Sequence, residues 1–96
     1  ALALKARAQI FTDDLAGGLA TARQCAVRAP TFQPCLVFLA LAAAVNGEDN
    51  LARDAGARLL AVNPAFSLDH HFRLIPFRKS EDVAFMSGHL RAAGLP

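Results

Sequence analysis

The feature that most constrains the fold of this chain is a proline followed two residues later by a phenylalanine, which occurs twice. The first copy lies at residues 29–32 (APTF) and the second at residues 63–66 (NPAF). Their spacing, about 34 residues, is typical of repeat proteins in which each unit is a pair of antiparallel helices. The spacing therefore predicts a scaffold of stacked helix hairpins.

The same offset, which carries Pro30 onto Pro64, relates positions far from the two prolines. When the chain is shifted against itself by this offset, apolar residues fall on apolar ones and small residues on small ones. Such pairs include Leu2 and Leu36, Leu4 and Phe38, Ala6 and Ala40, Asp14 and Glu48, Gly18 and Ala52, and Ala22 and Gly56. Small residues at matched positions are expected where two helices approach closely.

Residues 31–64 resemble one unit of the tetratricopeptide repeat. The resemblance rests on the apolar and small positions of both helices, the turn between them and the closing proline, namely Leu36, Leu39, Ala40, Gly47, Glu48, Ala52, Leu59, Leu60, Asn63 and Pro64. Two positions depart from the pattern, because Ala43 and Gly56 stand where large aromatic residues are usual. Residues 1–30 form a degenerate copy, with Lys5 at an apolar position and Asp13 in place of the turn glycine.

Residues 65–96 begin a third copy that Pro76 interrupts, because proline removes a backbone donor inside a helix. Ser80 is a candidate N-cap for a last helix that runs to about Ala93 and ends before Gly94. The prediction is one all-α domain over residues 1–96, with about two tetratricopeptide-like antiparallel hairpins and a C-terminal capping helix. We expect this domain to be a fragment of a longer chain.

The expected helices follow from caps and breakers. A first helix covers about 1–11, and Thr12, Asp13 and Asp14 offer an N-cap for a second that runs to about Arg28. A third runs from Thr31 or Phe32 to about residue 46, and a fourth from about 49 to 62. Abundant alanine and a hydrophobic content of 54% favour helices that bury a core.

Charge and hydropathy exclude two kinds of partner. A formal net charge of +2 with scattered cations is too weak for a nucleic-acid surface, which needs clustered positive charge. The longest apolar run covers residues 35–45, far short of the roughly 20 residues that cross a bilayer. We therefore expect this segment to bind neither nucleic acid nor a membrane.

The two cysteines lie on either side of the turn at Pro30. Cys25 and Cys35 could meet in a helical hairpin, but no secretory context accompanies them. We predict buried free thiols instead of a disulfide. A zinc site would need further soft ligands at short spacing, and the sequence has none.

The third helix leads to the main expectation about partners. Residues 35–45 are apolar on every side, so this helix must be buried all round. In a tetratricopeptide array, one face of such a helix normally lines an open groove, and here the candidate partner-binding groove is Pro34, Val37, Leu41, Ala44 and Val45. Three covers are possible for it: the last helix of the same chain, an identical chain in a homodimer, or a segment of another protein or of the part of this protein that lies outside these residues.

Few residues could take part in catalysis or bind a metal ion. Asp69, His70 and His71 form the one local cluster, but adjacent histidines on a helix point about 100° apart and make poor joint ligands. Arg73, Arg78 and Lys79 form a candidate basic patch, for which solvated charge is the simplest interpretation. We predict no catalytic residues, no metal site and no cofactor.

The tail carries a second resemblance. The stretches 63–67 (NPAFS), 75–78 (IPFR) and 89–96 (HLRAAGLP), with Asp82 between the last two, look like the C-terminal end of certain bacterial multidomain proteins. Those proteins resemble class III adenylate/guanylate cyclases with tetratricopeptide tails, or relatives with a winged-helix DNA-binding domain. His89 departs from their pattern, which has glycine at that place. The resemblance implies a cytoplasmic regulatory segment and carries over no cyclase activity.

Three functional hypotheses remain. The leading one is a non-enzymatic module for protein–protein interaction or self-association in a bacterial signalling protein. The second is a segment that regulates or positions a nucleotide cyclase or a DNA-binding domain outside these residues. The third, a small metal-dependent enzyme using Asp69, His70 and His71, is disfavoured by their geometry.

Overall fold

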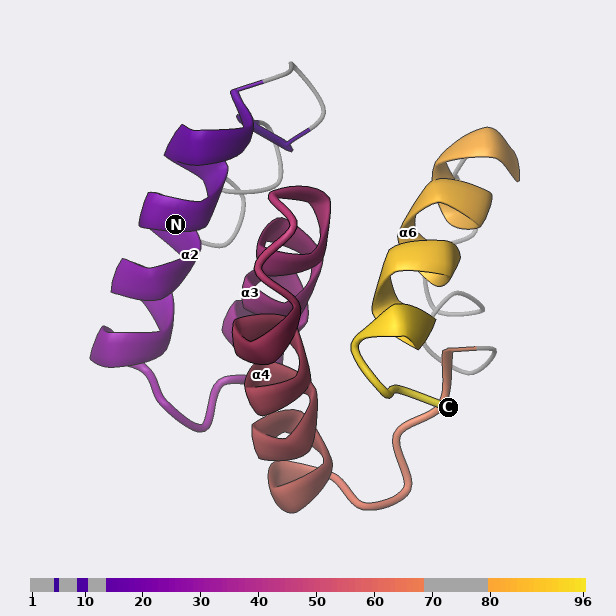
Figure 1. Ribbon diagram of the computed structural model, residues 1–96. Helices are drawn as coiled ribbons and strands as arrows, with labels where there is room; N and C mark the ends of the chain where they lie inside the picture. The colour runs from indigo at the N-terminus through magenta and orange to yellow at the C-terminus, as the bar shows by residue number, and fades with distance from the viewer. Residues whose placement is uncertain (1–4, 6–8, 11–13, 69–79) are drawn as a thin grey trace.

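The computed structural model describes residues 5, 9–10, 14–68 and 80–96 of the chain. Its helices are α2 (Leu15–Arg28), α3 (Gln33–Val45), α4 (Asp49–Val62) and α6 (Ser80–Ala92) (Figure 1). Within the described residues there is no strand, so the all-α prediction is confirmed. Most of the predicted first helix and the interruption at Pro76 lie outside these residues.

Local chemistry explains where the helices begin and end. The backbone N–H of Gly17 donates to Oδ1 of Asp14 at 3.2 Å, which makes Asp14 the N-cap of α2. Pro34 lies in the first turn of α3, where its missing N–H costs nothing. Gly47 follows α3 with a φ of 75°, a left-handed conformation that glycine adopts without strain. The predicted bounds of α2, α3 and α4 hold to within two residues.

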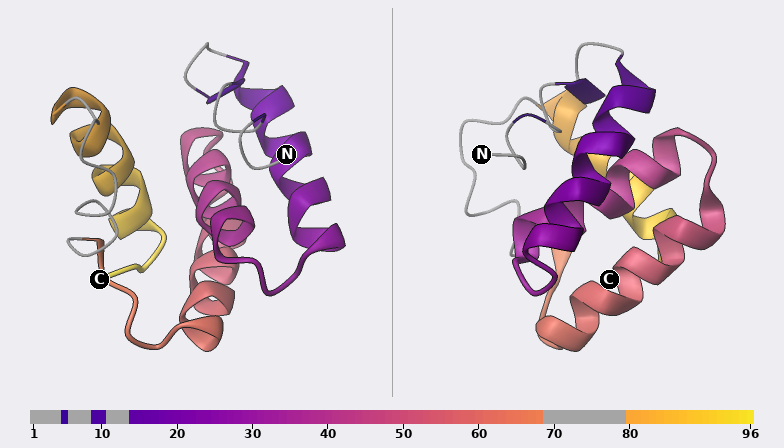
Figure 2. Two further views of the ribbon diagram at one scale, coloured as in Figure 1. Left: turned by 180° about the vertical axis from the view of Figure 1, so that it is seen from behind. Right: turned by 90° about the vertical axis from the view of Figure 1, so that its left-hand side faces the viewer.

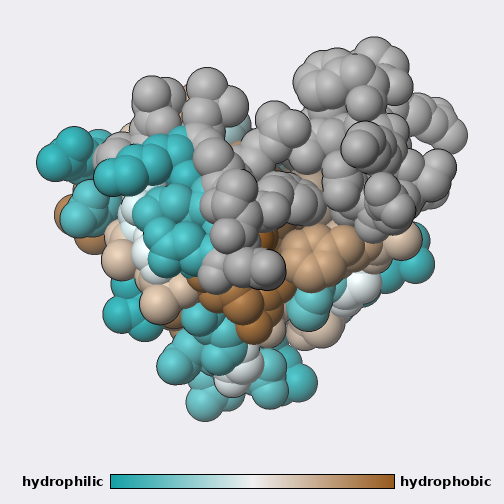
Figure 3. Space-filling view, turned by 90° about the horizontal axis from the view of Figure 1, so that it is seen from above, coloured by the Kyte–Doolittle hydropathy of each residue, from teal (hydrophilic) through white to brown (hydrophobic). Residues whose placement is uncertain are grey.

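Helix α3 is the centre of the molecule. It packs against α2, α4 and α6 (Figures 1 and 2). Every residue from Cys35 to Ala43 is buried, as its apolar sequence predicts. Seen from the upper end in Figure 1, the coloured residues show apolar groups gathered centrally and hydrophilic groups around them (Figure 3).

The offset between the two proline motifs also relates α2 to α4. These helices begin at residues 15 and 49 and end at 28 and 62, so both pairs of boundaries are separated by the same offset as Pro30 and Pro64. The buried positions of α4 follow the same rule, because each corresponds to a buried position of α2. The pairs are Gly18 and Ala52, Thr21 and Ala55, Ala22 and Gly56, and Cys25 and Leu59. Helices α2 and α4 therefore match in their bounds and in their buried positions.

The C-terminal segment, residues 93–96, packs against α4. A Cβ added to Gly56 would overlap the backbone carbonyl oxygen of Ala93, so a side chain at Gly56 would push this segment away. The N–H of Leu68 donates to the carbonyl oxygen of Pro96 at 2.7 Å, and Leu95 is buried. The principal dimensions of 28, 27 and 25 Å are nearly equal, because α6 packs back on α3 and α4 instead of extending a superhelix.

Two asparagines join the ends of neighbouring helices. Nδ2 of Asn46 donates to the carbonyl oxygens of Leu15 and Ala42, at 2.9 and 2.7 Å, and so joins the end of α3 to the start of α2. Nδ2 of Asn63 donates to Oε1 of Gln33 at 3.1 Å and joins the end of α4 to the start of α3. These hydrogen bonds fix how the three helices align along their lengths.

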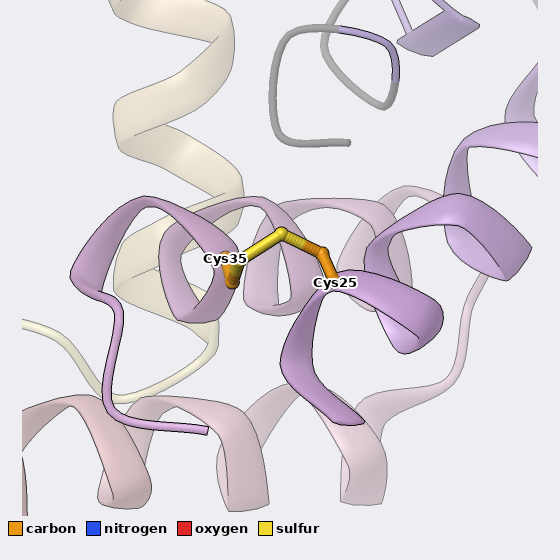
Figure 4. Close-up of a disulfide and its surroundings, with 2 residues drawn as sticks. All are labelled: Cys25 and Cys35. Atoms are coloured by element: carbon orange, nitrogen blue, oxygen red, sulfur yellow. A yellow bond between two sulfur atoms is a disulfide. The ribbon is translucent and has the colours of Figure 1, made fainter. Parts of the chain in front are cut away.

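The prediction of free thiols was wrong. Cys25 of α2 and Cys35 of α3 form a disulfide, with their Cα atoms 5.3 Å apart (Figure 4). The tight turn at Pro30 brings the buried face of α2 against the first turns of α3, and both cysteines lie on the faces that meet. This Cα separation lies within the range that is usual for disulfides. The prediction relied on cellular context and gave too little weight to the geometry of the hairpin.

Candidate interaction groove

The partner-binding groove predicted on α3 is not open in the structure. Val37 and Leu41 are 1% and 0% exposed, and the other three residues, Pro34, Ala44 and Val45, are half-buried. Helix α6 packs on α3 and places Met86 and Leu90 in the same core. Of the three covers considered from sequence, the last helix of the same chain is the one observed. Val37 and Leu41 therefore belong to the hydrophobic core, Ala44 and Val45 pack against it, and Pro34 is half-buried in the first turn of α3.

The structure does not describe the other residues singled out from sequence. Asp69, His70 and His71, and the basic patch of Arg73, Arg78 and Lys79, lie outside the described residues.

His89, by contrast, lies on α6, where its ring packs edge-on against Phe85 with centroids 4.8 Å apart. In the described part of the chain, no three His, Cys, Asp or Glu side chains gather in a way that could hold a metal ion.

A different groove lies between α2 and α4. It has a volume of about 430 Å³, with α2 and the following turn on one side, α3 beneath and α4 on the other side. Its lining is apolar except for two arginines and consists of Arg23, Ala26, Val27, Pro30, Leu39, Leu51 and Arg58.

Helical periodicity places these side chains in the groove. On α2, Arg23, Ala26 and Val27 are three and four residues apart, so they share one face, and Pro30 continues that face into the turn. On α4, Leu51 and Arg58 are seven residues apart, which is two helical turns. Leu39 of α3, with 2% exposure, forms the floor.

Val27 is the most unusual residue of the groove. Its side chain is 81% exposed, the highest value among the large hydrophobic residues in the described part of the chain. Its neighbour Ala26 is 3% exposed and Leu51 is half-buried, so the apolar surface runs from the open rim at Val27 to a closed floor. Val27 is therefore an exposed aliphatic side chain that adjoins a partly buried apolar groove.

The charges at this groove have one sign. Arg23 is exposed and Arg58 half-buried, and neither forms an ion pair with another described residue. The acidic residues of α4, Asp49 and Asp54, do not line the groove. The groove is therefore apolar at its base and positively charged at two points of its wall.

Sequence reasoning missed this groove because it assigned the binding face by analogy with the tetratricopeptide pattern, which directs attention to α3. The available signal was local. Val27 lies between two cations, Arg23 and Arg28, near the end of a helix whose buried face was already supplied by other residues. An aliphatic residue there has no intramolecular role in the pattern of buried positions.

Comparison of this chain with protein-family models, with curated proteins and with solved structures gives no match. Among the described residues no helix is long and apolar enough to span a membrane.

Proposed function

We propose that this domain is a non-enzymatic helical-repeat module that mediates protein–protein interaction, and that its contact site is the groove between α2 and α4. The observation that carries the proposal is the 81% exposure of Val27 at the rim of an apolar groove of about 430 Å³. The correspondence of α2 and α4 in their bounds and buried positions supports the helical-repeat part.

Self-association is part of the same proposal, but covering α3 no longer requires it. A homodimer was inferred from the need to cover α3, and α6 meets that need within the chain. Any dimer would have to use another surface, such as the exposed side chains of Val27 or Phe32. The resemblance to cyclase-like and winged-helix proteins adds the proposal that the module regulates or positions another domain of a bacterial signalling protein.

Selection from a random peptide library tests the proposal. Peptides displayed on phage are panned against the immobilised wild-type chain and, in parallel, against Val27→Asp, which keeps the fold because residue 27 is mostly in solvent. We expect peptides that bind the wild type and fail to bind Val27→Asp, while Ala20→Asp, an equal charge on an exposed position of the same helix, retains them. Recovery of no such peptide, together with monomeric sedimentation at all concentrations, would show that the domain is not this kind of module.

The cellular compartment is open to a direct test. The resemblance proposes the cytoplasm, where disulfides are rare, whereas the bond between Cys25 and Cys35 favours an oxidising compartment such as the bacterial periplasm. Rapid acid quenching of cells, followed by alkylation and mass spectrometry, distinguishes the cytoplasm from an oxidising compartment. Alkylated cysteines support the cytoplasm, and protected cysteines support the oxidising compartment.

A further inference from the structure

The walls of the groove between α2 and α4 specify the chemistry of a ligand more closely than its apolar floor does. We infer that the groove binds a short segment of another protein in which an aliphatic side chain lies next to a carboxylate. The aliphatic side chain would pack on Ala26, Val27 and Leu39, and the carboxylate would pair with Arg23 or Arg58. This inference rests on the proposed function and narrows it to one class of partner.

The positive charge of the groove indicates that its ligand carries a carboxylate. A guanidinium group presents donors in a planar fork that matches a carboxylate, often with two parallel hydrogen bonds. Arg23 and Arg58 come from different helices, line the same groove and form no ion pair with another described residue. An acidic ligand would therefore find two cations on the groove wall with their pairing capacity still available.

Size points to a peptide segment. A volume of about 430 Å³ accommodates one or two aliphatic side chains and a carboxylate. The exposure of Val27 shows that the rim is open to solvent. A small molecule in such a site would leave much of its own surface in water, whereas an extended peptide continues beyond the groove on both sides.

Symmetry disfavours a second copy of this chain as the occupant. A two-fold dimer in which each groove faces its counterpart would bring Arg23 and Arg58 against the same arginines of the other copy. Like charges placed together across an interface are strongly unfavourable. The charge of the groove thus favours a different and acidic partner.

The test uses peptides recovered by panning a random decapeptide library on the immobilised full chain. We expect Asp or Glu next to Leu, Ile, Val or Phe in most binders. Fluorescence anisotropy of the best synthetic peptide should give a dissociation constant that Arg23→Glu and Arg58→Glu each raise by roughly tenfold or more. Arg53→Glu, on an exposed site of α4 outside the groove, should change it by less than about twofold.

Other outcomes separate this inference from the proposed function. Binders that depend on Val27 but carry no acidic residue would overturn the inference and leave the interaction module standing. Absence of any binder that depends on Val27 would overturn the inference, and, together with monomeric sedimentation at all concentrations, the proposed function as well. Displacement of the peptide by equimolar decanoate, or a dimer that Arg23→Glu dissociates, would also overturn the inference, because the occupant would then be a small carboxylic acid or a second copy.

Discussion

At the scale of single residues, two glycines in helices have opposite roles. Gly56 is buried in α4, and a Cβ there would overlap the backbone carbonyl of Ala93, which cannot move aside as a flexible side chain can. Gly88 lies in α6 on an exposed site, and a Cβ there would meet no atom within 4 Å. The repeat pattern expects a large aromatic at position 56, and the C-terminal segment explains why none fits.

Substitution of each glycine by alanine should therefore change stability in opposite directions. We expect Gly56→Ala to lower the free energy of unfolding by about 1 to 3 kcal/mol through overpacking. Gly88→Ala should raise it by up to about 1 kcal/mol, because alanine is the better helix former. Urea denaturation followed by circular dichroism measures both. A neutral or stabilising Gly56→Ala would show that the C-terminal segment does not pack on α4.

At the scale of elements, the disulfide and the hydrogen bond from Asn46 to Leu15 hold α2 on α3. The disulfide joins Cys25 to Cys35, which are 10 apart in sequence, and a crosslink over such a loop restricts the unfolded chain by about 3 kcal/mol in the chain-entropy description. We expect Cys25→Ala with Cys35→Ala to lose about this much unfolding free energy in oxidising buffer.

A reducing agent provides the control for this prediction. Dithiothreitol should destabilise the wild type by a similar amount and leave the double variant unchanged, with urea midpoints as the measurement. Equal midpoints for the wild type in oxidising and reducing buffer would contradict a stabilising disulfide. The effect on α2 also bears on the groove, because Ala26 and Val27 directly follow Cys25.

Sequence periodicity predicted where the helices begin and end better than it predicted which helices pack against one another. Caps and breakers such as Asp14, Pro34 and Gly47 act through the local backbone, so they located the helix ends within two residues. The apolar pattern of residues 35–45 predicted a helix buried all round, since no arrangement leaves it in water. Which element covers a given face depends on contacts between residues far apart in sequence, and a periodic pattern does not encode that choice. The groove between α2 and α4 was missed for this reason, whereas the disulfide was missed because cellular context was given more weight than the geometry of the hairpin.

At the scale of the whole molecule, α6 determines which surface stays open. It packs on α3 with Met86 and Leu90 fully buried, and it does not line the groove between α2 and α4, which stays open. Binding on that surface should depend on both its aliphatic floor and its charge. We therefore expect ligand contacts to lie between α2 and α4.

Nuclear magnetic resonance titration tests this location most directly. The ¹⁵N-labelled chain is titrated with a peptide selected on the wild type, and shifts of assigned backbone amides are mapped on the structure. We predict that the largest changes lie at Arg23, Val27, Leu51 and Arg58, while amides of α6 around Gly88 stay unchanged. Changes concentrated on α6, or spread evenly over all the described helices, would contradict a binding site between α2 and α4.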